Sequence, residues 1–174
     1  MITLEPMSLH WLGELDRCAH GDVVFSVGTT AFGQNHLSDI TVSAAALFLL
    51  RTLRDDHTSQ APVTHGNQLF PCCGFNVYPA DGRFPALIDG CPRGFDLDVV
   101  HSDGFVTLRD RGGTAAVVAE AEWAAAVLGF VASVRAFHDQ SQRRVAVSER
   151  DDDGWPAFWR EWDDRVAAAV RDWS

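Results

Sequence analysis

The chain has 174 residues, of which 47% are hydrophobic and 22% charged, and its formal net charge is −10. This composition predicts one globular domain over residues 1–174, and no apolar run reaches the length of about 18 residues that a membrane helix needs. All fourteen basic residues are arginine, and the acidic excess argues against nucleic acid as a partner. It favours a basic protein partner, which opposite charge would steer.

The first residues, MITLEPMSLHWLGELD, contain early acids and no basic segment, so they do not resemble a secretory signal. We therefore expect a cytoplasmic protein. Its four cysteines (Cys18, Cys72, Cys73 and Cys91) are then expected to be reduced thiols.

The N-terminal part predicts one clear helix. Leucines at 9, 12 and 15 allow a short helix near the start, and residues 23–27 (VVFSV) predict a strand. Residues 44–54 are good helix formers, with Thr41 or Ser43 as the cap. Arg51 and Arg54 lie in the last turn of this helix, where the helix dipole favours positive charge.

The centre of the chain predicts antiparallel strands. Residues 75–78 and 86–89 flank a turn at 80–82. Asp103-Gly104 is a strong hairpin signal, and this turn places Val99 opposite Leu108 and Asp98 opposite Arg109. Alternation then assigns the core face to one set of residues: Phe95, Leu97, Val99, His101, Val106 and Leu108.

Two further expectations follow from this register. A second turn at Gly112-Gly113 places Val117 opposite Leu108, on the core face. On the other face, Asp96 lies opposite Arg111. We therefore interpret Asp96 and Asp98 as members of solvated ion pairs with arginine rather than as an acid–base pair.

Two helices close the chain, at residues 120–139 and from about Pro156 to the end. The last helix carries an apolar stripe on one side: Trp155, Phe158, Trp159, Trp162, Val166, Val170 and Trp173. The fold class predicted from these elements is α+β, a mainly antiparallel β-meander from about residue 75 to 119 with one helix before it and two C-terminal helices packed on one face.

Two kinds of site suggest themselves. The first is a protein-binding surface, because tryptophan next to acids is a composition typical of binding hot spots; its candidate residues are Asp151, Asp152, Asp153, Trp155, Trp159 and Glu161. The second is a thiol-based enzyme site around Cys72, Cys73 and Cys91, with Cys73 first or Cys91 as the nucleophile and His65 or His101 as the base. The cysteine and histidine spacing fits no zinc motif, and the nucleotide-binding, P-loop, GxSxG and HExxH motifs are absent, so we expect no metal and no cofactor.

Four segments, TVSAAALFLLRTLRDDH, LFPCCGFNVY, GCPRGFDLDVVH and GWPAFWREW, together resemble a family of small uncharacterised bacterial proteins. The resemblance spans most of the chain and implies no activity. Our first hypothesis is a non-catalytic binding protein of the immunity or inhibitor type that blocks a basic toxin or enzyme. The alternatives are the thiol enzyme and a structural or assembly subunit that uses the tryptophan stripe as a homodimer surface.

Overall fold

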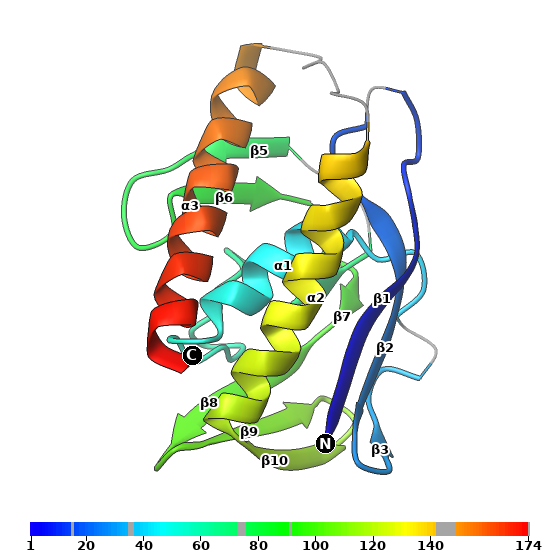
Figure 1. Cartoon of the computed structure of the whole chain (residues 1–174), viewed down its shortest axis with the longest axis vertical. Coiled ribbons are helices and arrows are strands. Elements are labelled where there is room, and N and C mark those ends of the chain that lie inside the picture. The colour runs from blue at the N-terminus through cyan, green and yellow to red at the C-terminus, as the bar shows by residue number, and fades with distance from the viewer. Residues whose placement is uncertain (15, 35–36, 73–75, 91, 142–148, 174) are drawn as a thin grey trace.

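The structure is a computed structural model, and it describes residues 1–14, 16–34, 37–72, 76–90, 92–141 and 149–173, with the side chains of residues 149–152 left out. Three helices and ten strands follow one another in the described part (Figure 1). In chain order they are β1 (Ile2–His10), β2 (His20–Val27), β3 (Thr30–Ala31), α1 (Val42–Arg51), β4 (Phe70–Pro71), β5 (Asn76–Pro79), β6 (Ala86–Asp89), β7 (Gly94–Phe95), β8 (Leu97–Ser102), β9 (Phe105–Asp110), β10 (Ala115–Ala119), α2 (Glu120–Gln140) and α3 (Glu149–Trp173). The predicted α+β class, with antiparallel sheets, one helix before the later strands and two C-terminal helices, is confirmed.

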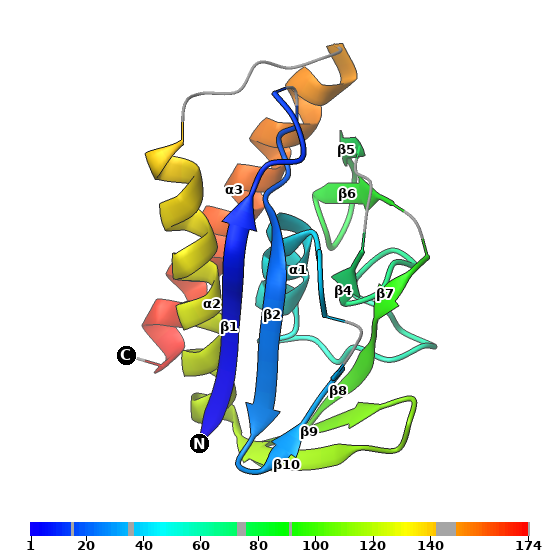
Figure 2. The same cartoon turned by 90° about the vertical axis from the view of Figure 1, so that its right-hand side faces the viewer.

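The strands of the described residues divide among four small sheets rather than forming one continuous meander. These are β1-β2-β3, β10-β9-β8, the pair β4-β7 and the pair β5-β6, and every pairing is antiparallel. Figure 2 shows β1 and β2 side by side in front of α1 and α2, with β8, β9 and β10 at the base of the molecule. No described helix has the length and apolar content that crossing a bilayer requires.

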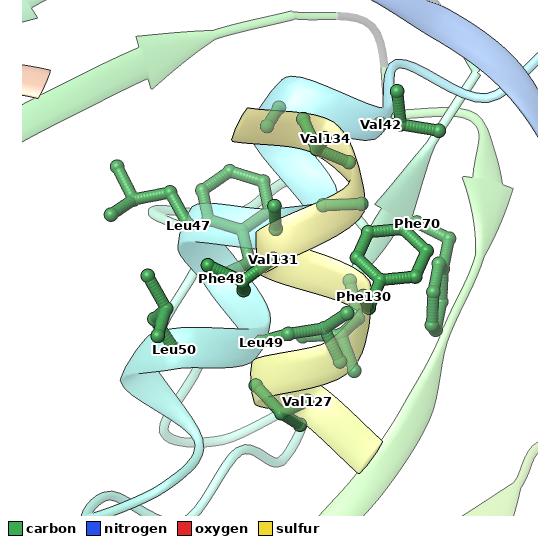
Figure 3. Close-up of a cluster of buried hydrophobic side chains, with 14 of the residues drawn as sticks. Val42, Leu47, Phe48, Leu49, Leu50, Phe70, Val127, Phe130, Val131 and Val134 are labelled. Atoms are coloured by element: carbon green, nitrogen blue, oxygen red, sulfur yellow. The ribbon is translucent and has the colours of Figure 1, made fainter. Parts of the chain in front are cut away.

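Helix α1 is the centre of the core. Every residue from Val42 to Arg51 is buried, because the helix contacts α2, α3, β2 and β4 and so has no side left for solvent. Figure 3 shows the apolar side chains of α1, among them Leu47, Leu49 and Leu50, in one buried cluster with Val127, Phe130 and Val131 of α2. A sequence with no charge before Arg51 fits a helix that is apolar all round.

The hairpin register is confirmed at β8 and β9 and is wrong at β10. Val99 pairs with Leu108 and Asp98 with Arg109, as predicted. Leu108, however, pairs with Ala116, so Val118 is buried and Val117 is exposed. The turn has three residues instead of two, because the Asp110 carboxylate accepts the Thr114 N–H at 2.8 Å and closes it one residue earlier.

The N-terminal region also differs from the prediction. The short helix around residues 9, 12 and 15 does not form: Leu9 belongs to β1 and Leu12 is exposed, while residue 15 lies outside the described residues. At the other end, α3 begins at Glu149, so Pro156 lies inside the helix instead of near its start.

Candidate functional site

The structure does not assemble the predicted thiol site from its described residues. Cys73 and Cys91 lie outside the described residues. Cys72 lies near the N-terminal end of α1, because the preceding Pro71 accepts the Thr41 N–H at 2.9 Å. His65 lies at the other end of this ten-residue helix, 3.4 Å from an Arg51 nitrogen, and one helix of that length spans about 15 Å.

His101 is not the core histidine that the register predicted. It lies at the end of β8, and its side chain is partly exposed and contacts the Asp56 carboxylate at 3.0 Å. The strand pairing is as predicted, and the partner Val106 is buried, but the His101 side chain itself is 20% exposed. His101 therefore contacts a surface carboxylate.

A different histidine lies at the Cys72 end of α1. His20, at the start of β2, is buried, and its ring contacts the Asp16 carboxylate at 3.3 Å and the Thr41 hydroxyl at 3.4 Å. Burial raises the pKa of the Asp16 carboxyl, but hydrogen bonds from His20, Cys18 and Leu12 outweigh it, so the net pKa lies below its ordinary value. This group joins β2 to α1 and is the polar core of that end of the molecule.

The predicted binding surface on α3 is largely buried. Trp155 and Glu161 are 3% and 4% exposed, so the expectation that they face a partner is wrong. Trp159 is half-buried beneath the Arg135 guanidinium, which lies 4.9 Å above its ring. Asp153 is exposed, whereas the side chains of Asp151 and Asp152 lie outside those described.

Glu161 instead holds a buried ion pair with Arg51. The carboxylate accepts two hydrogen bonds from the Arg51 guanidinium, at 2.8 and 2.9 Å, and further ones from Arg165 and from the Ala86 N–H. Arg51 also donates to the carbonyls of Val63 and Ala86, at 2.7 and 2.5 Å. This network joins α1, α3, β6 and the loop after α1. The Glu161 carboxylate and the Arg51 guanidinium both bind groups of the fold itself.

The charges of this network are stable at neutral pH. Burial raises the pKa of Glu161, but the hydrogen bonds and charge of Arg51, with the hydrogen bonds of Ala86 and Arg165, outweigh burial and leave the pKa below its ordinary value. Burial lowers the pKa of Arg51, and the facing Glu161 offsets part of that effect. We therefore interpret the pair as structural.

An open pocket of about 520 Å³ lies where β3, β7 and the β9–β10 turn meet. We call it the Asp96 pocket. Its polar lining residues are Gln34, Gln68, Asp96, Asp110, Arg111 and Thr114, and its apolar wall includes Ala31 and Phe95. Pockets of this size hold small ligands.

The buried side chain of His57 hydrogen-bonds the Asp96 carboxylate. The prediction that Asp96 forms a solvated ion pair is therefore wrong. Asp96 Oδ1 accepts hydrogen bonds from the Leu69 N–H at 2.9 Å and from His57 Nε2 at 3.0 Å. The Val63 N–H donates to His57 Nδ1, which assigns the ring proton to Nε2. The predicted partner Arg111 does contact Oδ2, at 3.3 Å.

Burial raises the pKa of the Asp96 carboxyl, but the hydrogen bonds from His57 and Leu69 and the charges of His57 and Arg111 outweigh burial, so the pKa lies below its ordinary value. Because the folded pKa is depressed, this carboxylate stabilises the fold above its ordinary pKa, and that contribution is lost as the pH falls through the folded pKa. We expect Asp96→Asn to lower the free energy of unfolding at pH 7 by about 1.5–3 kcal/mol, the range for hydrogen bonds to charged groups. Urea unfolding at a series of pH values from 7 to 2 measures this loss. The difference in free energy of unfolding between the wild type and Asp96→Asn should become smaller in acid.

Asp98→Asn is the matched control for this measurement, since Asp98 lies two residues away, opposite the exposed Arg109. We expect it to cost less than about 1 kcal/mol. A gap for Asp96→Asn that stays constant down to pH 2 would contradict the assignment of a charged, supported carboxylate.

The second candidate surface is the outer face of the sheet β1-β2-β3, which we call the open sheet face. Its residues are Thr3, Glu5, Met7, Asp22, Val24, Ser26 and Ala31. Met7 and Val24 are each 47% exposed, and Glu5 and Asp22 beside them are exposed too. Figure 2 shows no helix in front of β1 and β2 on this side.

The charge of this face has one sign. The three strands contain no arginine, and residues 1–50 contain only Arg17. Asp39 lies next to the face, because its N–H donates to the Asp22 carboxylate at 3.0 Å. The carboxylates of Glu5 and Asp22, beside the exposed Met7 and Val24, therefore have no arginine of their own sheet as a partner, while Asp39 contacts His10 of β1 at 3.5 Å.

The free edge of β1 is protected against strand addition. Pro6 pairs with Val23, whose N–H donates to the Leu37 carbonyl and not to β1. Pro6 and Val23 therefore form a non-hydrogen-bonded pair of the ladder. The backbone nitrogen of Pro6 accordingly points away from β2, to the open edge, where it offers no N–H to an added strand. We therefore expect a partner to bind on the face of this sheet and not by adding a strand to the edge of β1.

Comparison of the chain with protein-family models, with curated proteins and with solved structures finds no match. The resemblance of the four segments to a bacterial family stays a prediction. In the described part, no group of three or more His, Cys, Asp or Glu residues is placed to hold a metal ion. The Asp96 pocket and the open sheet face are therefore the candidate sites among the described residues.

Proposed function

We propose that this chain is a non-catalytic binding protein whose open sheet face docks on a basic protein. The observation that carries the proposal is the exposure of Met7 and Val24 among Glu5 and Asp22, on strands without any arginine. Methionine is enriched at the centre of protein interfaces, and carboxylates at the rim steer a basic partner and select it. A net charge of −10 adds a long-range attraction of the same sign.

The concrete form that we propose is an inhibitor of the immunity type, which acts in the cytoplasm and covers a basic toxin or enzyme. The rigid core supports this role, because α1 is buried throughout and holds the sheet from behind. A preformed face loses little conformational entropy on binding. The proposal replaces the α3 surface predicted from the sequence, since Trp155 and Glu161 are buried.

A matched pair of charge-reversal variants tests the location of the interface. We expect Glu5→Lys/Asp22→Lys to weaken capture of the basic partner by about tenfold or more, because each reversal replaces an attraction by a repulsion. Asp153→Lys/Asp164→Lys changes the net charge equally on exposed positions of α3 and should leave capture unchanged. The measurement is cross-linked capture from cells of the source organism, quantified by mass spectrometry for the wild type and both variants.

Thermal unfolding of both variants checks that the fold is kept. Equal loss of capture in the two variants would show only a general charge effect, and loss confined to the α3 variant would return the interface to the surface predicted from the sequence. Either result contradicts the proposed face. Rescue of growth on co-expression with a captured toxin tests the inhibitor role separately.

A further inference from the structure

We infer that the Asp96 pocket receives an arginine side chain of the basic partner, whose guanidinium binds Asp96 and Asp110 and displaces Arg111. The inference rests on the proposed function for the identity of the partner. The chemistry of the pocket itself can be tested without the partner.

The pocket continues the open sheet face. Ala31 pairs with Ser26 at the edge of that face and also lines the pocket, as do Gly33 and Gln34 just after β3. A protein that covers the open sheet face therefore reaches the mouth of the pocket with its rim. One side chain projecting from such a partner is the occupant that the arrangement suits.

The inner wall of the pocket is preorganised for a cation. His57 and the Leu69 N–H occupy Oδ1 of Asp96 from the protein side, which leaves Oδ2 toward the pocket. The Asp110 carboxylate is fixed by the Thr114 N–H at 2.8 Å, and Asp110 lines the same pocket. Two carboxylates held by backbone and histidine donors bind a cation without reorganising.

Arg111 is an internal stand-in for this cation. It follows Asp110 on the exposed β9–β10 turn, its side chain is 71% exposed, and its nitrogen lies 3.3 Å from Asp96 Oδ2. The Arg111 side chain lies mostly in solvent, and its 3.3 Å contact is long for a charge-assisted hydrogen bond, so an incoming guanidinium can replace Arg111 at small cost. The same contact shows that the pocket wall accepts a guanidinium at Oδ2.

The lining distinguishes arginine from lysine. A guanidinium presents five N–H donors in a planar fork, which can serve two carboxylates and the carboxamide oxygens of Gln34 and Gln68 together. An ammonium has three donors on a point charge and fits one carboxylate at a time. We therefore expect a preference for arginine.

Calorimetric or NMR titration with Nα-acetyl-arginine methylamide tests the inference on the intact chain, with the acetyl-lysine analogue as the competitor. We expect Asp110→Asn, which keeps the Oδ1 acceptor for Thr114, to weaken binding about tenfold. Arg111→Ala should strengthen it about two- to fivefold, because it removes the internal competitor. Asp98→Asn removes an equal charge outside the pocket and should leave the affinity unchanged.

The opposite sign for Arg111→Ala, no effect of Asp110→Asn, or equal affinity for the lysine analogue would each overturn the inference. The two proposals fail separately. If Glu5→Lys/Asp22→Lys loses partner capture and the arginine probe does not bind, only the pocket proposal is rejected. The expected probe pattern combined with unaltered capture in that variant rejects the open sheet face and leaves a guanidinium site.

Discussion

Replacing Glu161 with alanine is expected to lower the free energy of unfolding by about 3–5 kcal/mol, the usual cost of leaving a buried charge without its partner. The replacement removes both carboxylate contacts of Arg51 and the acceptor of the Ala86 N–H, while Arg51 itself stays fully buried. Urea unfolding followed by tryptophan fluorescence measures the change, since Trp162 lies next to Glu161 in α3.

Asp172→Asn is the control for the Glu161 variant, because it breaks an ion pair between the same two structural regions on the surface. Asp172, in α3, pairs with Arg54, just after α1, and both side chains are about half exposed. We expect this change to cost less than about 1 kcal/mol. Similar losses in the two variants would show that burial of the Arg51–Glu161 pair does not matter, against the structural role assigned to it.

Replacing Gly154 with alanine is the second substitution for which we expect a large loss, about 3 kcal/mol, at the upper end of the overpacking range. Gly154 lies in α3 where the helix crosses β5, and an added Cβ would overlap the Val77 carbonyl and approach the Tyr78 nitrogen. Both obstacles are backbone atoms, so no side chain can turn away to make room. Thermal unfolding measures the loss.

Gly129→Ala serves as the control, because it makes the same change inside a helix, α2, where an added Cβ meets nothing within 4 Å. Alanine is the better helix former, so this variant should gain about 0.5–1 kcal/mol. Opposite signs for the two variants would establish that close backbone contact, not helix propensity, requires glycine at 154. A stable Gly154→Ala variant would contradict the observed approach of α3 to β5.

Local patterns were sufficient for most of the elements. Helix periodicity located α1 and α2, and Asp103-Gly104 correctly set the β8–β9 register, because a type I′ turn depends only on its own residues. The next turn depended on a side chain: the Asp110 carboxylate closes a three-residue loop, and the resulting shift by one residue exposes Val117 and buries Val118. Turn composition alone could not distinguish the two loop lengths.

The buried charges were the main failure of the sequence analysis. A signal was present at Glu161, which follows Phe158 by three residues and so lies on the apolar side of α3, and at Arg51, which ends a helix without other charges. The prediction from sequence places Glu161 on the exposed side of α3, since charged residues are usually exposed, and uses Arg51 only as a favourable charge at the end of its helix. The partner that makes their burial tolerable lies 110 residues away in the chain, and only the packing of α1 against α3 reveals it.

The sequence by itself determined the α+β class, the central helices, the first hairpin and the acidic charge, because these depend on residue type and local spacing. The tertiary structure decided which side chains are available to other molecules. It buried Trp155, Trp162 and Glu161 of α3, placed His65 at the opposite end of α1 from Cys72, and turned Asp96 onto His57. It also left Met7 and Val24 exposed beside Glu5, because helices cover only the inner side of their sheet. Exposure follows from the packing of distant segments, and that is why the candidate interface lies on β1-β2-β3 and not on α3.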